Sequence, residues 1–525
     1  MSGALDARIA AAAARDLPLA ASILREAIRV PADHVDRAPA PAETPGGAGS
    51  GGDPLCGTSN HEGPRLRYLR AALLEAGGVL DEDDVGFDAF GNLYWVLEDP
   101  DDGVPRRDKR VVYLDGHADT VHPLRERWRE RTGGLDAFDG LVDQARLDRA
   151  FLRRELGWLP PDDEWEHLVF GRGAADQLGG VAAQIVASRI LVELRAEGAL
   201  RGVVVRSYVT PAEEDNEGGG PFYLTRRVFP GAPPAMLPDV VVLTEMSGDT
   251  TDGALVIRHG QRGRMTIEVR VTGRSCHGSI PREGLNPLEH GAAILAEAAA
   301  RHERGEGFGH DERLGPGSRT ATWGAVETAS DCSVPERFTF RFDRRLTAGE
   351  SPDEALRAVA ALDSVARAIA DGLHVEIAVP RYEETTRRGY RPGNPRVYGA
   401  WLTPADHPAI AAAEAAYRAV VTPHVDEPHE GGGSLRREPR LGTWRFSTDG
   451  VGWPAPVDEP ALVVPASKRW VTAGSMRHPA IFGLGPGIMQ NAHKVGEALD
   501  LRELRHAVAF LARYPSLFAA DAAAQ

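Results

Sequence analysis

The stretch VVYLDGHADT, residues 111–120, joins a run of apolar residues directly to two side chains that can bind a metal ion. The apolar run Val111–Leu114 predicts a strand that is buried on both faces. His117 and Asp119 follow at the point where that strand ends. Ligands of open parallel sheets bind beyond the carboxyl ends of the strands, so this stretch predicts both a sheet and the edge that carries its chemistry.

Three further apolar runs have the same character: Val203–Val209, Val240–Leu243 and Ala480–Leu484. Helical spacing is found at about 4–30, 64–76 and 176–197. Continuous apolar strands that alternate with helices predict an α/β fold, with a mostly parallel sheet and helices on both of its faces.

The pattern changes near residue 259. Met265–Val271 and Arg337–Phe342 alternate apolar and polar residues, which predicts strands with one face in solvent. With a helix at residues 286–301, a second helix that starts near Ser351-Pro352 and a strand at His374–Val379, the order is strand, helix, strand, strand, helix, strand. This order predicts a ferredoxin-like α+β domain. Ser351, Pro352 and Glu354 are expected to form a capping box at the second helix.

These changes predict a discontinuous organisation. We expect a main domain at 1–258 and 383–525, and an inserted domain at 259–382. A Pro/Gly-rich stretch, Ala38–Gly52, is expected to be a loop.

Composition and charge argue against nucleic-acid binding, a disulfide framework and a membrane span. The 525 residues exceed what one core usually holds, and the formal net charge of −16 disfavours nucleic-acid binding. Cys56, Cys276 and Cys332 provide no disulfide framework, which favours a reducing, cytoplasmic location. We find no apolar run long enough for a membrane span and no secretory signal, so no membrane partner is expected.

More carboxylates and imidazoles follow the predicted strands. Glu213 and Glu214 follow the second run, Glu245 the third, and Asp176 and His493 lie in GRGAADQLGG and PGIMQNAHKVGE. Divalent ions such as zinc bind histidine nitrogen and carboxylate oxygen. Two ions ~3.5–4 Å apart need a carboxylate that bridges them, and a further carboxylate to accept a proton from the attacking water. Glu213 and Glu214 could divide the roles of ligand and base.

In this order the motifs resemble the M20 family of metallopeptidases and amidohydrolases, which includes aminoacylases, glutamate-type carboxypeptidases (carboxypeptidase G) and succinyl-diaminopimelate desuccinylase. The resemblance covers most of the chain and includes CHGSIPREGLNP, residues 276–287. DQLGG after Ala175, together with WRFSTDG at 444–450, is most similar to the branch of hydrolases linked by name to selenium metabolism.

The resemblance implies a role for each residue of the site. His117, Asp176 and Glu245 would hold one ion, and Asp176, Glu214 and His493 the other. Glu213 would be the general base, and Asp119 would orient the ring of His117. The family also implies a cis peptide bond, here between Asp176 and Gln177.

The inserted domain would be a lid or dimerisation domain of a homodimer. His277 would stabilise the oxyanion, often in the partner's site. Substrate-binding roles are implied for Arg344 or Arg345, Asn286, Gly485 and Gly487, and alternation alone does not decide between the two arginines.

We therefore expect a two-metal hydrolase that cleaves the amide bond of an N-acyl amino acid, dipeptide or related small amide. A water between two ions, zinc or else manganese or cobalt, would be activated by Glu213. The alternatives are an N-carbamoyl amidase, which usually has histidine in place of Glu245, and a non-catalytic metal-binding scaffold. The long span from Asp119 to Asp176 predicts an inserted helical segment near the pocket that could restrict substrate size.

Overall fold

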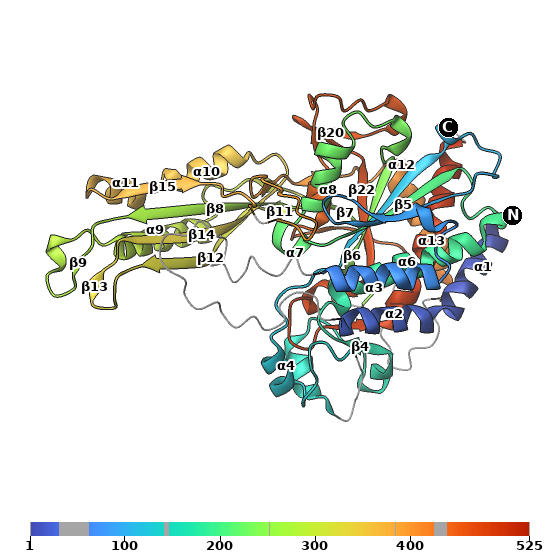
Figure 1. Cartoon of the computed structure of the whole chain (residues 1–525), viewed down its shortest axis with the longest axis horizontal. Helices are drawn as coiled ribbons and strands as arrows, with labels where there is room; N and C mark the ends of the chain where they lie inside the picture. Colours follow the sequence, from blue (N-terminus) through green and yellow to red (C-terminus); the bar gives the residue numbers. More distant parts are fainter. Residues whose placement is uncertain are drawn as a thin grey trace.

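The computed structural model describes residues 2–30, 62–140, 146–250, 253–383, 385–424 and 438–523. The loop expected at 38–52 and Cys56 lie outside these ranges. The molecule is elongated, with a larger body that holds both described ends and a narrower insert that extends from one side (Figure 1).

The body is built on a sheet that has nine strands within the described ranges, in the order β1-β2-β5-β3-β6-β22-β7-β17, with β18 beside β7. The strands are β1 (Val85–Phe87), β2 (Leu93–Glu98), β3 (Arg110–His117), β5 (Val203–Thr210), β6 (Val240–Gly248), β7 (Ile257–Gln261), β17 (Trp401–Leu402), β18 (Leu441–Trp444) and β22 (Ala480–Ile488). Strands β5, β3, β6 and β22 run parallel, and they contain the four apolar runs, so the predicted parallel core is confirmed.

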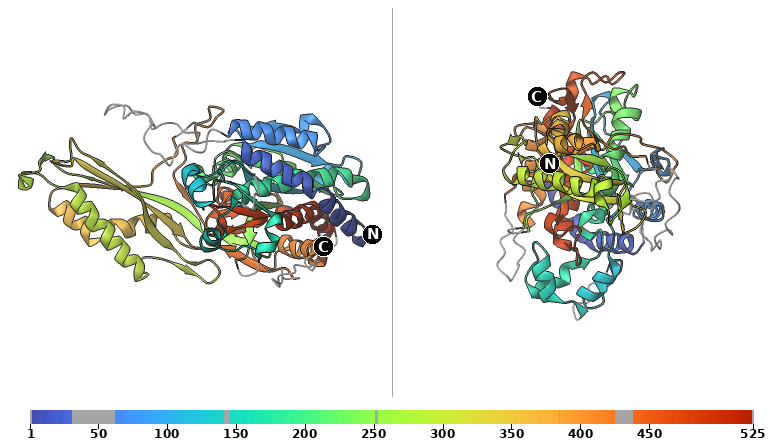
Figure 2. Two further views of the ribbon diagram at one scale, coloured as in Figure 1. Left: turned by 90° about the horizontal axis from the view of Figure 1, so that it is seen from below. Right: turned by 90° about the vertical axis from the view of Figure 1, so that its left-hand side faces the viewer.

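Long helices form a layer on one face of this sheet (Figure 2). They are α1 (Ser2–Arg15), α2 (Leu17–Arg29), α3 (Gly63–Glu75), α6 (Gly179–Glu193), α12 (Pro408–Val420) and α13 (Leu501–Ala523). Val112 and Leu114 pack against this layer, while Tyr113 points to the opposite face and packs against Trp453. That face is covered by the short helix α8 (Gly219–Tyr223) and by turns. In the part of the chain described, no helix is long and apolar enough to cross a bilayer.

The insert is a second sheet, in the order β12-β14-β8-β15, with every pairing antiparallel. Its elements are β8 (Gly263–Thr272), α9 (Pro287–Glu303), β12 (Ser318–Glu327), β14 (Arg337–Leu346), α10 (Pro352–Ala360), α11 (Asp363–Ala370) and β15 (His374–Ala378). The predicted element order is confirmed, with the second helix divided in two. The capping box is wrong, because the side chain of Ser351 makes no capping hydrogen bond.

The predicted helical segment between Asp119 and Asp176 forms a small lobe below the body in Figure 1. It contains α4 (Arg125–Arg131), α5 (Arg149–Glu155) and β4 (Leu168–Phe170), and β4 pairs with β23 (Ala498–Asp500). Its own apolar cluster includes the buried side chains of Trp128 and Trp165.

Candidate metal centre

The five predicted ligands and the predicted base converge at one edge of the body sheet. They arrive from five segments: His117 ends β3, Glu213 and Glu214 begin α7 (Glu213–Asn216) just after β5, Glu245 lies in β6, Asp176 precedes α6, and His493 follows β22 and the turn η13 (Met489–Asn491). As expected for a mostly parallel sheet, the carboxyl ends of neighbouring strands bring distant residues together.

Asp176 lies between two groups of possible ligands. Its Oδ1 is 3.0 Å from His117 Nε2, and its Oδ2 is 2.9 Å from His493 Nε2. His117 Nε2 is also 3.7 Å from Glu245 Oε2, and His493 Nε2 is 3.1 Å from Glu214 Oε2. We call His117, Asp176 and Glu245 the inner triad, and Asp176, Glu214 and His493 the outer triad. One carboxylate thus offers one oxygen to each triad, as a bridging ligand does.

The residues fit two divalent ions. In each triad the candidate ligand atoms all lie within 4.8 Å of one another. The inner triad is fully buried, and Glu245 Oε1 is a buried oxygen with no hydrogen-bond partner. A buried carboxylate oxygen without a partner is costly unless a cation binds it. Two imidazoles and three carboxylates are donors that zinc accepts.

Asp119 orients both the histidine and the base. His117 Nδ1 lies 3.0 Å from the carbonyl oxygen of Asp119. A carbonyl only accepts, so Nδ1 carries a proton and donates it, and Nε2 faces the inner triad. The carboxylate of Asp119 accepts hydrogen bonds from the backbone N–H groups of Glu213, at 3.0 Å, and Glu214, at 2.8 Å.

Two supporting contacts were missed by the sequence analysis. Glu497, the last residue of the quoted NAHKVGE motif, is fully buried and accepts hydrogen bonds from the N–H groups of Ala175 and Asp176. Its other oxygen pairs with Arg172 at 2.6 Å. Gln177 donates from Nε2 to Glu245 at 2.6 Å. The four-residue spacing from His493 to Glu497 was the available signal for the first contact.

The backbone beside Asp176 has the predicted conformation. The peptide bond from Asp176 to Gln177 is cis, and helix α6 begins only at Gly179. Gly487 has φ +112°, and a Cβ there would lie 2.9 Å from the Cβ of Ala175. At Gly485 a Cβ would lie 1.9 Å from a backbone oxygen in β6. These two glycines therefore allow close approach of backbones behind the centre.

Glu213 lies beside the inner triad without belonging to either triad. Its Oε2 is 3.9 Å from His117 Nε2, and its side chain is buried. Burial raises the pKa of Glu213 well above its ordinary value; His117 opposes this shift, while Glu214 and Glu245 add to it. For Asp176, hydrogen bonds to His117 and His493 outweigh burial and hold its pKa well below the ordinary value.

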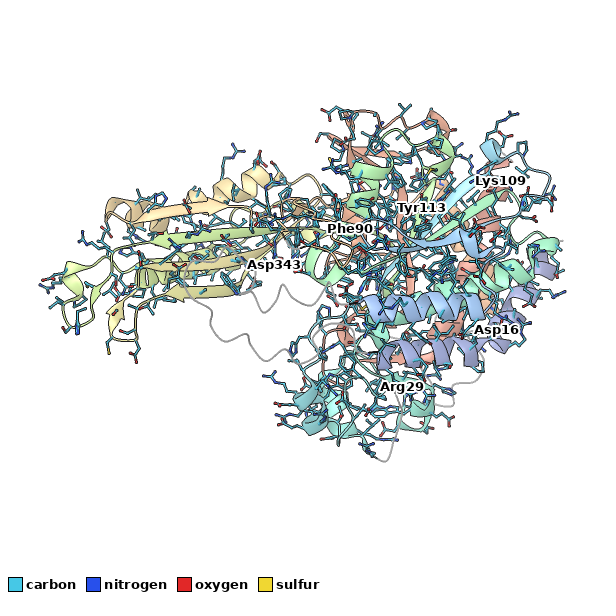
Figure 3. All side chains as sticks on the ribbon, viewed as in Figure 1. Asp16, Arg29, Phe90, Lys109, Tyr113 and Asp343 are labelled. Carbon is cyan, nitrogen blue, oxygen red and sulfur yellow. The ribbon has the colours of Figure 1, made fainter. Side chains whose placement is uncertain are left out.

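A cavity of about 460 Å³ opens onto the centre. Its lining combines the carboxylates of the centre and His493 with Arg345, Arg445, Phe446 and Ser447. Arg345 pairs with Asp343, which lies near the junction of insert and body (Figure 3). Arg344 points to the opposite face of its strand, where it is buried and pairs with Glu350. Of the two predicted arginines, only Arg345 faces the cavity.

His277 and Asn286 do not line this cavity. Strand β9 (Cys276–His277) lies at the far tip of the insert, and His277 is exposed there (Figure 1). Asn286 accepts a hydrogen bond from the N–H of Leu288 and caps α9.

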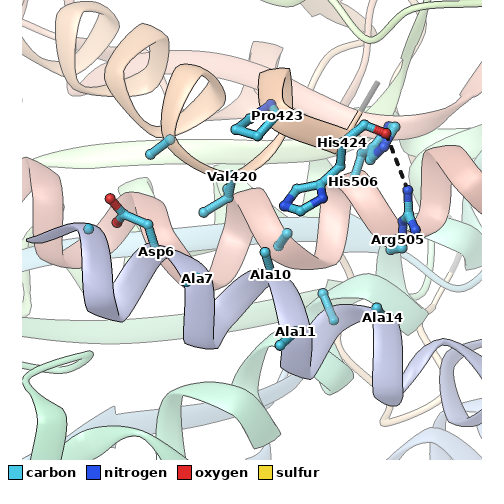
Figure 4. A pocket seen from close by; sticks show the side chains of 14 residues that line it. Asp6, Ala7, Ala10, Ala11, Ala14, Val420, Pro423, His424, Arg505 and His506 are labelled. Atoms are coloured by element: carbon cyan, nitrogen blue, oxygen red, sulfur yellow. Dashed lines mark hydrogen bonds between the residues drawn. The ribbon is translucent and has the colours of Figure 1, made fainter. Parts of the chain in front are cut away.

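A second cavity of about 510 Å³ lies between α1, α12 and α13 (Figure 4). Alanines of α1 form much of its lining, and Arg505 donates to the carbonyl of His424 at its edge. Neither triad contributes to it, so the candidate metal ligands belong to the first cavity alone among these two.

The small lobe contacts the loop that carries His493. Asn491 Oδ1 accepts from the N–H of Gly157 at 2.7 Å, and its Nδ2 donates to the carbonyl of Trp158 at 3.0 Å. Asn491 itself is buried, whereas the side chain of His493 is 52% exposed. The lobe therefore supports the outer triad from behind, while the cavity walls come from other segments.

Comparisons with known proteins point to the same family as the sequence motifs. Residues 259–364 match the family model for the peptidase dimerisation domain of M20 type. The chain is 31% identical over 399 residues to the uncharacterized protein YgeY of Escherichia coli strain K12, covering 74% of this chain and 81% of that protein. It is 30% identical over 192 residues to succinyl-diaminopimelate desuccinylase of Stenotrophomonas maltophilia, covering 36% of this chain and 42% of that enzyme. The dipeptidase Dug1p of Saccharomyces cerevisiae has the same fold, with a TM-score of 0.62 at 13% identity over 99% of both chains.

Proposed function

The chain belongs to the M20 family of metal-dependent peptidases and hydrolases, and from this premise we propose that it hydrolyses the amide bond of an N-acyl amino acid, a dipeptide or a related small amide. The observation that carries the proposal is the position of Glu213, a buried carboxylate beside the inner triad that remains free to act as a base.

We propose that the inner and outer triads each bind one zinc ion, although manganese or cobalt can use the same donors. When bound, the ions supply Lewis-acid stabilisation of the carbonyl oxygen and lower the pKa of the attacking water. Glu213 accepts a proton from the water as the new C–O bond forms. It then donates that proton to the amine nitrogen as the C–N bond breaks.

We also propose a homodimer in which residues 259–382 form the lid and dimerisation domain and 1–258 with 383–525 form the catalytic domain. The ten-residue strand β12 is at the edge of the insert sheet, and Val326 on it is 41% exposed. A long, open edge strand is suited to pairing with another chain. Pairing along β12 would allow His277 of a second copy to reach this cavity and stabilise the oxyanion.

The test is a substrate screen with a matched base variant. Zinc-loaded protein and Glu213→Gln are incubated with pooled N-acyl amino acids, dipeptides and N-carbamoyl amino acids, and products are followed by mass spectrometry. Glu213→Gln should keep its metal content and lose turnover by at least about a hundredfold, the smaller end of general-base effects. Equal turnover by both proteins would remove Glu213 from the mechanism. Binding of metal without hydrolysis of any compound would favour the scaffold alternative.

A further inference from the structure

The positive charges at the cavity are unequally neutralised. Arg345 Nε and Nη2 donate to the two oxygens of Asp343, at 2.7 and 3.0 Å, and its Nη1 donates to Ser447 at 2.6 Å. Asp343 is shared with Arg264, which also pairs with Glu217, so these two carboxylates balance the charges of both arginines. Ser447 occupies the remaining end of Arg345. This arginine is suited to holding the cavity wall in place.

Arg445 differs from Arg345 in having no such partner. It lines the same cavity and is exposed, and among the residues that the structure describes it makes no hydrogen bond or ion pair. Trp444, the residue before it, is fully buried and donates from its indole to the carbonyl of Met246. The backbone at Arg445 is therefore held in place by its neighbour, while the guanidinium of Arg445 is available to bind a ligand.

A second arginine adds positive charge behind Arg445. In the parallel pairing of β18 with β7, Trp444 lies opposite Gln261, so Arg445 and Arg262 follow two paired residues. Arg262 is 8% exposed; its Nε donates to the carbonyl of Leu314, and it forms no ion pair within the described part of the chain. Burial lowers the pKa of Arg262, and the charges of Arg445 and Arg345 lower it further. Like charges held this close favour the binding of an anion.

We propose that Arg445 binds a carboxylate of the substrate, so that the preferred amides are anionic, while Arg345 positions Ser447. This assignment rests on the proposed amide hydrolase. A guanidinium offers paired N–H groups that match the two oxygens of a carboxylate. Arg445 lines the same cavity as the carboxylates and His493 of the metal centre, where the scissile amide would lie.

The experiment measures binding rather than turnover, so that it can fail independently of the proposed hydrolysis. Zinc-loaded Glu213→Gln is titrated by calorimetry with the N-acetyl derivatives of alanine, methionine and glutamate, each beside its carboxamide. At least one acid should bind about 10- to 100-fold more tightly than its amide, the range expected for a hydrogen-bonded charge pair. Adding Arg445→Gln should remove this preference, Arg445→Lys should restore part of it, and 1 M salt should reduce it.

Arg313→Gln is the matched control, because Arg313 is an exposed arginine that pairs with Asp311 outside the cavity. It should retain the full preference for the acid. The proposal is overturned if the preference survives Arg445→Gln, or if the parent protein shows no preference for any acid. Neither result depends on whether the active protein hydrolyses the same compounds.

Discussion

The inner and outer triads of the metal centre share Asp176 but differ in what holds them. The inner triad is buried and is supported by the backbone carbonyl of Asp119 and the side chain of Gln177, which belong to turns that adjoin the sheet. The outer triad depends on His493, whose half-exposed ring sits on a loop held by the small lobe. The comparison suggests one ion position that is fixed by the core of the fold and another that is fixed by an appended segment.

The largest expected effect is on the binding of the two ions. It is tested by replacing one histidine in each triad. His117→Ala should weaken binding of the inner ion by more than about a hundredfold, because the ion loses one of its three protein ligands, and even a group that only orients a ligand is worth about 10- to 100-fold. His493→Ala should weaken the outer ion by less, since water can occupy the exposed position of the ring. Dialysis against zinc buffers followed by elemental analysis measures both. Equal losses in the two variants would contradict the distinction.

The second prediction concerns the protons that zinc displaces from the histidines, and it applies to both the inner and the outer triad. In the metal-free protein the charge of Glu214 raises the pKa of His493 well above its ordinary value. Burial lowers the pKa of His117, but hydrogen bonds to Asp119 and Asp176 outweigh burial and raise it overall. Each ring therefore carries a second proton at neutral pH, and an ion must displace that proton. Zinc affinity should fall as the pH is lowered, by about tenfold per unit for each displaced proton.

Calorimetry in buffers with different protonation enthalpies counts the protons released on zinc binding. His493→Ala should release fewer protons than the unmodified protein. The difference is the number of protons displaced from the outer triad. Zinc affinity that is independent of pH, with no proton release, would show that the two rings are neutral before the ion binds.

The two triads also differ in how far they could be predicted. The inner residues follow continuous apolar runs, and such runs predict buried strands whose ends meet at one edge. The hydrogen bond from the N–H of Gly157 to Asn491 could not be predicted in this way, because those residues are 334 positions apart and neither lies in a segment with helical or strand periodicity. Similarly, alternation along β14 shows that Arg344 and Arg345 point to opposite faces, but only the packing of α9 shows which face is covered. Arg445 was quoted within WRFSTDG without a role, since an unpaired charge is visible only once its neighbours are placed.

The smallest effect tests the support that the small lobe gives to the outer triad. Asn491→Ala removes hydrogen bonds to Gly157 and Trp158 without touching a ligand. Zinc affinity of the outer triad should fall by roughly tenfold, which is typical when a group that orients a metal ligand is lost. Zinc affinity of the inner triad should be unchanged. Asn286→Ala is the control, because that asparagine caps a helix of the insert far from the metal centre. If Asn491→Ala weakened both ends equally, the lobe would be stabilising the whole body, and the outer ion position would not depend on it in particular.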